Sequence, residues 1–233
     1  MPAADDSVLD NPAWNALIGP EAALATRIGN AARFDPEMSP FAGLADGDPA
    51  SWADLARLVG PGGAIVLTGG PQSPPPAWGE AFRVVGSQMI ADSIEPLLLA
   101  DDGELVELGD ADAPAMLDLA TRTRPGPFES RTHEFGGYLG VYREGRLVAM
   151  AGERLRPPGF TEISAVCTDE SARGEGLAGR LVRAVATNIE RRGETPMLHV
   201  AGSNAGAIRL YEKLGFRSRT PITFGGFTAP GAA

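Results

Sequence analysis

The chain has 233 residues, of which 43% are hydrophobic and 21% charged, which is typical of a soluble globular protein with one large or two small domains. No apolar run approaches the roughly 20 residues of a membrane-spanning helix, and the acidic residues 1–12 do not resemble a secretory signal. The single cysteine, Cys167, excludes an intrachain disulfide and a cysteine-based metal cluster. We therefore expect a cytoplasmic protein that contacts no membrane and holds no metal.

The net charge of −10 lies entirely in the first part of the chain. Residues 1–102 hold 14 acidic residues and 4 arginines, whereas residues 103–233 hold 16 acidic and 16 basic residues. An acidic surface disfavours binding to nucleic acid, so we expect no nucleic-acid partner. Plain solubility explains the excess, and attraction of a cationic substrate is the alternative.

The first hundred residues are interrupted by Pro and Gly and predict only short elements. Ser51 is the expected N-cap of a helix that presents Trp52, Leu55 and Val59 on one face. In chain order we expect a helix within 11–29, a helix at 51–59, a strand at 62–70, a Pro-rich loop at 71–79 and a strand at 81–91.

The pattern becomes clearer after residue 94. Two strands are expected around an Asp-Asp-Gly turn at 101–103, and from residue 104 the order is β-α-β-β-β-α-β-α-β. This order predicts an α/β domain over 103–233, preceded by a separate region over 1–102. The expected elements are a strand and helix within 104–123, a hairpin over 138–153, a strand at 160–168, a helix at 176–193, a strand at 196–202, a helix at 204–216 and a strand at 220–227.

A run of small residues joins the strand at 160–168 to the next helix. The Walker pattern and the dinucleotide fingerprint both fit this run poorly. What remains is Arg173-x-x-Gly176-x-Ala178, which puts bare backbone amides at a helix N-terminus. Such amides and the helix dipole can hold a diphosphate, although a tightly packed turn would use the same residues.

A second motif lies about 30 residues downstream, Asn204-x-x-Ala207-x-x-x-Tyr211-x-x-x-Gly215-Phe216. The two motifs in this order, with "EISAVCT" upstream, resemble the GNAT (GCN5-related N-acetyltransferase) superfamily, most of all its FR47-like branch. The resemblance covers about 104–224 and is strongest over 160–217. It implies the GNAT fold, a mixed central sheet flanked by helices. Residues 1–102 would then be an additional α/β region, either a degenerate half-copy of that fold or a cap over the acceptor.

The resemblance implies acetyl-CoA as cosubstrate and no metal. The amide of Val166, freed by a bulge in its strand, would point at the thioester carbonyl, and Thr168 would pair with the pantetheine arm. The residues implied in binding the cofactor are Val166, Cys167, Thr168, Arg173, Gly174, Gly176, Leu177, Ala178, Gly179, Asn204, Ala207 and Tyr211.

The resemblance also suggests catalytic roles. Tyr211 would protonate the departing CoA thiolate, and otherwise it is a half-buried aromatic of the helix. The base would be Glu162 or His199, whose alternatives are a strand-edge carboxylate and a core histidine, or neither of them. Cys167 is interpreted as a buried structural thiol rather than a nucleophile. Glu153 and Arg154, at the end of the third strand, are expected to face the acceptor.

We therefore predict an acyl-CoA-dependent N-acyltransferase that moves an acetyl group to a primary amine by direct attack in a ternary complex. The acceptor could be a small amine or a peptide or protein N-terminus, acyl chain length is open, and a homodimer is allowed. A catalytically silent acyl-CoA-binding module is the alternative. An unrelated nucleotide-binding α/β protein is a third hypothesis, which binding of ATP or NAD would favour.

Overall fold

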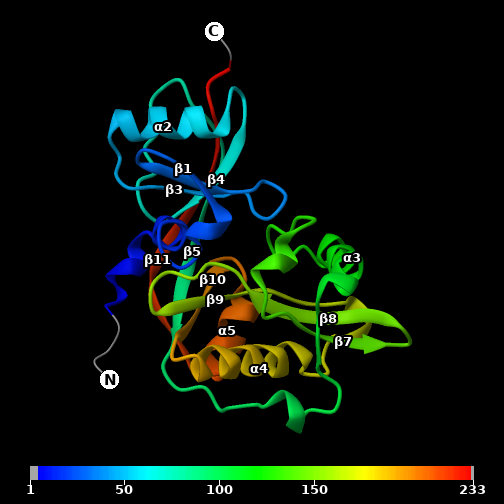
Figure 1. The fold of residues 1–233 in the computed structure, drawn as a ribbon. Coiled ribbons are helices and arrows are strands. Elements are labelled where there is room, and N and C mark those ends of the chain that lie inside the picture. Colours follow the sequence, from blue (N-terminus) through cyan, green and yellow to red (C-terminus); the bar gives the residue numbers. More distant parts are fainter. Residues whose placement is uncertain (1–4, 232–233) are drawn as a thin grey trace.

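The computed structural model describes residues 5–231, which form one eleven-stranded mixed sheet flanked by helices (Figure 1). The strand order is β1-β2-β3-β4-β11-β5-β10-β9-β8-β7-β6. The strands are β1 (Ala25–Ile28), β2 (Ala31–Phe34), β3 (Phe41–Leu44), β4 (Ala64–Thr68), β5 (Gly79–Ala91), β6 (Val106–Glu107), β7 (Leu139–Arg143), β8 (Arg146–Glu153), β9 (Phe160–Thr168), β10 (Thr195–Ala201) and β11 (Phe216–Thr228). The helices are α1 (Pro12–Leu17), α2 (Pro49–Val59), α3 (Ala113–Thr123), α4 (Leu177–Arg191) and α5 (Ala205–Lys213).

Two long strands connect an N-terminal lobe (β1–β4, α1 and α2) to a C-terminal lobe (β6–β10 and α3–α5). β5 and β11, each 13 residues long, run side by side through both lobes (Figure 1). β11 pairs with β4 over Phe224–Thr228 in the N-terminal lobe, and β5 pairs with β10 in the C-terminal lobe. One sheet therefore contains strands from both sides of residue 102. The division of the chain into two domains at 102/103 stays a prediction.

The C-terminal lobe buries side chains on both faces of its sheet. Along β8, Ala149 and Ala151 pack in the cluster that contains α4, whereas Met150 packs in the cluster that contains α3. Successive side chains of a strand point to opposite faces, so α3 and α4 cover opposite sides. The residues spaced by four along α4 are all buried, as the sequence predicts; they are Leu177, Leu181, Val185 and Ile189.

The predicted element order from residue 104 is confirmed throughout the C-terminal lobe. The hairpin between β7 and β8 turns at Glu144 and Gly145, both with positive φ (51° and 76°), as a tight two-residue turn requires. Gly193, with φ 82°, follows the end of α4 as predicted. No helix within residues 5–231 is both long and apolar enough to cross a membrane.

The predictions for the first hundred residues are confirmed only in part. The helix expected within 11–29 is present as α1 but ends at Leu17, because Gly19-Pro20 follows it, and the chain then forms a short 3₁₀ segment and β1. The strand expected just before the 101–103 turn is a short 3₁₀ segment at Leu99–Asp101. Strands β1, β2 and β3 were not predicted, whereas the strands at 62–70 and 81–91 are confirmed as β4 and β5.

Ser51 is not the N-cap of α2. The helix begins two residues earlier, at Pro49, after an N-cap at Asp48. Proline fits the first helical position because its missing N–H needs no partner there. Ser51 is instead fully buried inside the helix, and its hydroxyl hydrogen-bonds the Asp46 carboxylate. Trp52 and Leu55 are buried as predicted.

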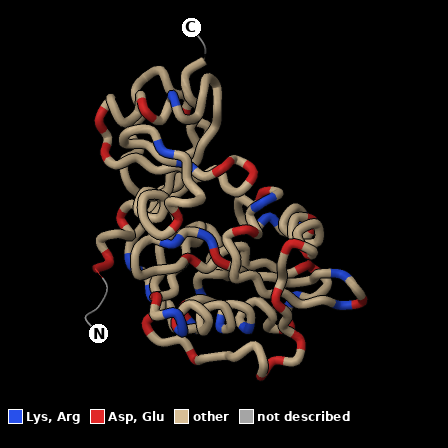
Figure 2. The backbone as a smooth tube through the Cα atoms, in the orientation of Figure 1, with Lys and Arg blue, Asp and Glu red and all other residues tan. Residues whose placement is uncertain are grey.

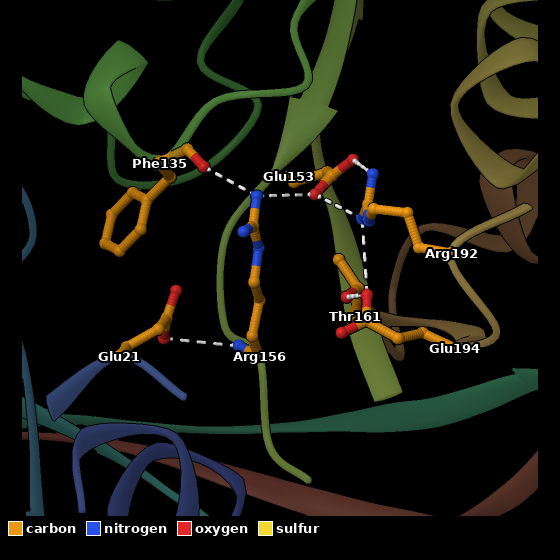
Figure 3. A network of polar contacts seen from close by, with 7 residues as sticks. All are labelled: Glu21, Phe135, Glu153, Arg156, Thr161, Arg192 and Glu194. Atoms are coloured by element: carbon orange, nitrogen blue, oxygen red, sulfur yellow. Dashed lines mark hydrogen bonds and ion pairs between the residues drawn. The ribbon is translucent and has the colours of Figure 1, made fainter. Parts of the chain in front are cut away.

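A polar network lies where the C-terminal end of β8 meets the N-terminal lobe (Figure 3). The fully buried Glu153 accepts hydrogen bonds from Arg192 (3.0 and 2.8 Å) and from Arg156 (2.8 Å). Glu21 lies on the other side of Arg156 and accepts one hydrogen bond, from the Arg156 backbone N–H at 3.2 Å. Burial raises the pKa of Glu21 to about 8, and the Arg156 contacts offset this only in part.

Glu21→Gln is expected to change the pH dependence of stability. The pKa of Glu21 in the folded protein, about 8, lies above the ~4.3 of an unfolded chain. The contribution of Glu21 to the free energy of unfolding is therefore complete below about pH 4 and is lost as the pH rises through 8. The glutamine variant should match the wild type at pH 4 and exceed its free energy of unfolding by roughly 4 kcal/mol at pH 8. Urea unfolding at both pH values checks this, and an equal difference at both would contradict it.

Candidate active site

The C-terminal lobe opens where two parallel strands separate. β9 and β10 pair only from Phe160 to Glu162 and from Thr195 to Met197. Both strands continue beyond this point, to Thr168 and Ala201, without pairing to each other. The result is a V-shaped gap that starts beside Glu162.

A β-bulge lies on β9 at the edge of this gap. Met150 of β8 pairs with Cys167 and Gly152 pairs with Ser164, so Ala151 alone faces both Ala165 and Val166. Ala165 has a φ of 53°, in the left-handed region. An extra residue in a bulge interrupts the ladder of backbone hydrogen bonds. The predicted bulge is thus present; the role of the Val166 amide stays a prediction.

The glycine stretch forms the N-terminus of α4. Gly176 is the N-cap residue with φ 75°, a conformation that side chains with a Cβ rarely adopt. The first helical hydrogen bond runs from the Arg180 N–H to the Gly176 carbonyl at 3.2 Å, and no side chain caps the helix. The amides of Leu177, Ala178 and Gly179 therefore have no intrahelical partner. Such a terminus suits an anion.

A cavity of about 620 Å³ occupies the gap between β9 and β10. Its walls are formed by β9, β10, the starts of α4 and α5, and the 123–126 loop. The predicted site residues that line it are Val166, Cys167, Thr168, Arg173, Ala178, His199, Asn204, Ala207 and Tyr211. Those that do not line it are Glu162, Gly174, Gly176, Leu177 and Gly179.

Helix α5 carries Tyr211 into the cavity wall. The Asn204 side chain caps this helix by accepting a hydrogen bond from the Ala207 N–H at 3.1 Å, which fixes where the helix begins. Tyr211 is 8% exposed and packs edge-on against Phe216, with ring centroids 6.0 Å apart. Burial raises the pKa of Tyr211 to about 12, so its hydroxyl keeps its proton at neutral pH.

Glu162 lies at the point of the V and is fully buried. Arg154 donates two hydrogen bonds to its carboxylate, at 2.9 and 2.7 Å, and His199 Nδ1 lies 2.8 Å from Oε1. Burial alone would raise the pKa of Glu162, but electrostatic attraction by Arg154 and His199, together with their hydrogen bonds, outweighs it and holds the pKa well below its usual range. A carboxylate this firmly paired is a weak proton acceptor.

The partners of His199 indicate which ring nitrogen carries the proton. Gln88 Oε1 accepts from Arg219 (3.0 Å) and its Nε2 donates to the Leu9 carbonyl (2.9 Å), which fixes the orientation of the Gln88 amide. The same Nε2 lies 3.0 Å from His199 Nε2, which must accept. The proton is therefore on Nδ1, which donates to Glu162. In this arrangement the basic nitrogen of His199 is already in use.

Comparison with known proteins decides the family. A crystal structure of a protein from Novosphingobium aromaticivorans assigned to the GNAT family of acetyltransferases is 44% identical, covering 98% of this chain and 100% of that one, with a TM-score of 0.88. The chain belongs to the GNAT family. A family model described as FR47-like protein matches residues 138–224, which confirms the resemblance identified in the sequence.

Curated relatives match a shorter part of this GNAT chain. Mycothiol acetyltransferases from Brachybacterium faecium and Thermomonospora curvata are 39% and 40% identical over 83 and 76 residues, 34% and 32% of this chain. The chain spans about a quarter of the length of these relatives. A GCN5-related N-acetyltransferase from Kribbella flavida, 16% identical, shares the fold over 94% of this chain and 95% of its own, with a TM-score of 0.59.

Sequence reasoning missed part of this GNAT site. Of the two residues expected to face the acceptor, Arg154 lines the cavity and Glu153 does not. The ion pair of Arg154 with Glu162 was not predicted, and Gln88 was not considered. The Ser and Pro-Gly positions of the wall, Ser164 and 125–126, were also missed because nothing in their local pattern distinguishes them from loop and strand residues. Cys167 is 7% exposed, and burial raises the pKa of its thiol to about 11, which supports a structural role.

Proposed function

We propose that the protein is an N-acetyltransferase that moves the acetyl group of acetyl-CoA to a primary amine within a ternary complex. The observation that carries this proposal is a single cavity bordered by the split between β9 and β10, the start of α4 and Tyr211. Members of the GNAT family use acetyl-CoA, and the named acetyltransferases among the relatives support the same chemistry. The cytoplasm as location and a peptide N-terminus as an alternative acceptor belong to the same proposal.

The residues of this chain fit acetyl-CoA. The unpaired amides at Leu177, Ala178 and Gly179 offer donors for a diphosphate, and the positive end of the α4 dipole favours its charge. The bulge of β9 at Val166 interrupts the strand ladder beside the cavity, where an amide could stabilise the oxyanion. Asn204 and Ala207, on the opposite wall, would contact the pantetheine arm.

In the reaction the amine nitrogen attacks the thioester carbonyl carbon, so that a C–N bond forms and the C–S bond breaks. We propose that the Tyr211 hydroxyl stabilises the departing thiolate. Because the pKa of Tyr211 is about 12 and that of a free thiol ~8.5, complete proton transfer would be uphill by roughly 3 to 4 pKa units. Tyr211 therefore acts mainly as a hydrogen-bond donor to the sulfur.

The amine loses its proton to water in this proposal. Glu162 neutralises Arg154, and the unprotonated Nε2 of His199 accepts a hydrogen bond from Gln88, so neither residue is positioned to act as the base. Their role is to hold the start of the V rigid, since Glu162 lies on β9 and His199 on β10.

The proposal is tested by incubating the protein with acetyl-CoA and a panel of primary amines and measuring free thiol together with acetylated amine by mass spectrometry. Equal amounts of thiol and acetylated amine support the enzyme. Binding of acetyl-CoA without acetylation of any amine favours the silent module, and tighter binding of ATP or NAD than of acetyl-CoA favours a nucleotide-binding protein.

Tyr211→Phe separates a catalytic from a structural hydroxyl. It is expected to lower kcat by ~10–100-fold, the value of one hydrogen bond to a charged group, with little change in the Kd of acetyl-CoA. Tyr142→Phe is the matched control, because its hydroxyl bonds Asp112 (2.7 Å) and Tyr142 does not line the cavity. A lower melting temperature with an unchanged rate in Tyr211→Phe would mean that its hydroxyl is structural.

A further inference from the structure

A second cavity of about 310 Å³ adjoins the first and reaches into the N-terminal lobe. Phe41 of β3, Phe82 and Val84 of β5, and Phe224 of β11 line it. The two cavities share Arg154 and His199, together with parts of the 125–126 loop and Ala201. We call this second cavity the apolar chamber; it lies on the far side of the Arg154–His199 wall from the start of α4.

The apolar chamber offers aromatic contacts and almost no polar ones. Phe82 and Val84 are 45% and 42% exposed and lie two residues apart on one face of β5, where neighbouring exposed apolar side chains suit a ligand. The Arg154 guanidinium stacks on the Phe41 ring at 4.7 Å, and the His199 ring meets Phe224 edge-on at 5.6 Å. The polar groups of the wall are thus themselves packed against aromatic rings.

No acidic side chain of residues 5–231 lines either the first cavity or the apolar chamber. The acidic residues that give residues 1–102 their negative charge lie elsewhere along the chain, on loops, on helices and at strand ends (Figure 2). Among the described residues, Arg154 is the only side chain of the chamber wall with a fixed charge, and the buried Glu162 behind the wall neutralises it. The acidic excess therefore places no carboxylate in the wall of either cavity.

We propose that the apolar chamber binds the acceptor and selects a primary amine carried on an apolar or aromatic body with no second positive charge. This inference rests on the proposed function and adds the substrate class to it. The amine would lie at the shared wall, facing the first cavity, while the body packs against Phe82, Phe224 and Val84. A second cation would enter an apolar space whose lining offers no carboxylate, because Glu162 lies behind the wall and is already paired with Arg154.

Binding to the protein saturated with CoA tests this without turnover. By calorimetry, 2-phenylethylamine should bind with a Kd at least tenfold lower than that of ethanolamine or spermidine. Phe82→Ala should raise the Kd of 2-phenylethylamine at least fivefold and leave CoA binding unchanged. Val85→Ala is the matched control, because Val85 is 59% exposed on the same strand and does not line the chamber.

Two results would overturn the proposal: ethanolamine or spermidine binding as tightly as 2-phenylethylamine, or a Phe82→Ala variant that binds 2-phenylethylamine as the wild type does. The thiol-release assay on the same preparations keeps the two proposals apart. Selective binding of 2-phenylethylamine without acetylation of any amine would support the chamber and reject the enzyme. Acetylation of polar amines in preference to 2-phenylethylamine would support the enzyme and reject the chamber as its acceptor site.

Discussion

Gly176→Glu is expected to weaken acetyl-CoA binding by at least a hundredfold, ~3 kcal/mol. Gly176 is the N-cap of α4, directly before three amides without intrahelical partners. A carboxylate there would repel a diphosphate and compete with it for those amides. Because a Cβ at Gly176 meets no atom within 4 Å, the loss would come from charge and backbone conformation rather than from a clash inside the protein.

Gly193→Glu is the matched control for this variant. Gly193 follows the C-terminal end of the same helix, has φ 82°, close to the 75° of Gly176, and also leaves a Cβ free of neighbours. Both variants should lose a similar, small amount of stability, ~1 kcal/mol, from the strained backbone. Calorimetry should then find the acetyl-CoA affinity reduced only in Gly176→Glu. Equal affinities in the two variants would mean that no diphosphate binds at the start of α4.

Glu162→Gln is expected to lower the free energy of unfolding by ~3 kcal/mol, equivalent to a melting temperature lower by about 6–12 °C for a chain of this size. The substitution keeps the shape of the side chain but leaves the buried Arg154 guanidinium without a counter-charge. The glutamine amide would also direct N–H groups toward the N–H donors of Arg154. Thermal and urea unfolding measure the change.

Glu134→Gln is the control, because Arg131 binds Glu134 with the same two-pronged geometry, at 2.6 and 2.8 Å, on an exposed surface. Exposed ion pairs contribute little, so this variant should lose less than ~1 kcal/mol. If Glu162→Gln unfolds like Glu134→Gln but loses ~10²–10⁴ in kcat, Glu162 is the general base and the role given to water is wrong.

The sequence predicted the C-terminal lobe well because its local signals agree with one another. In α4, the apolar residues spaced by four are all buried, and a glycine flanks the helix at each end. The strands β1, β2 and β3 were missed because each has four residues, and the burial of β3 shows no alternation that a sequence pattern could reveal. These strands form because of the strands they pair with, rather than because of a pattern in their own residues.

The polar groups at the start of the V could not be predicted for a similar reason. Gln88 and His199 are 111 positions apart and meet only because β5 pairs with β10 in one register. Glu162 looked like a catalytic base in the sequence, since its position on the strand was known but its ion pair with Arg154 was not. Local patterns predict which elements form, whereas the protonation of a buried group depends on neighbours that the fold brings together.

A crystal structure of the protein with CoA tests the central claim most directly. The account predicts diphosphate oxygens within ~2.7–3.1 Å of one or more of the amide nitrogens of Leu177, Ala178 and Gly179, and the thiol in the cavity between β9 and β10 beside Tyr211. CoA bound elsewhere, or in this cavity with its diphosphate away from the start of α4, would contradict it.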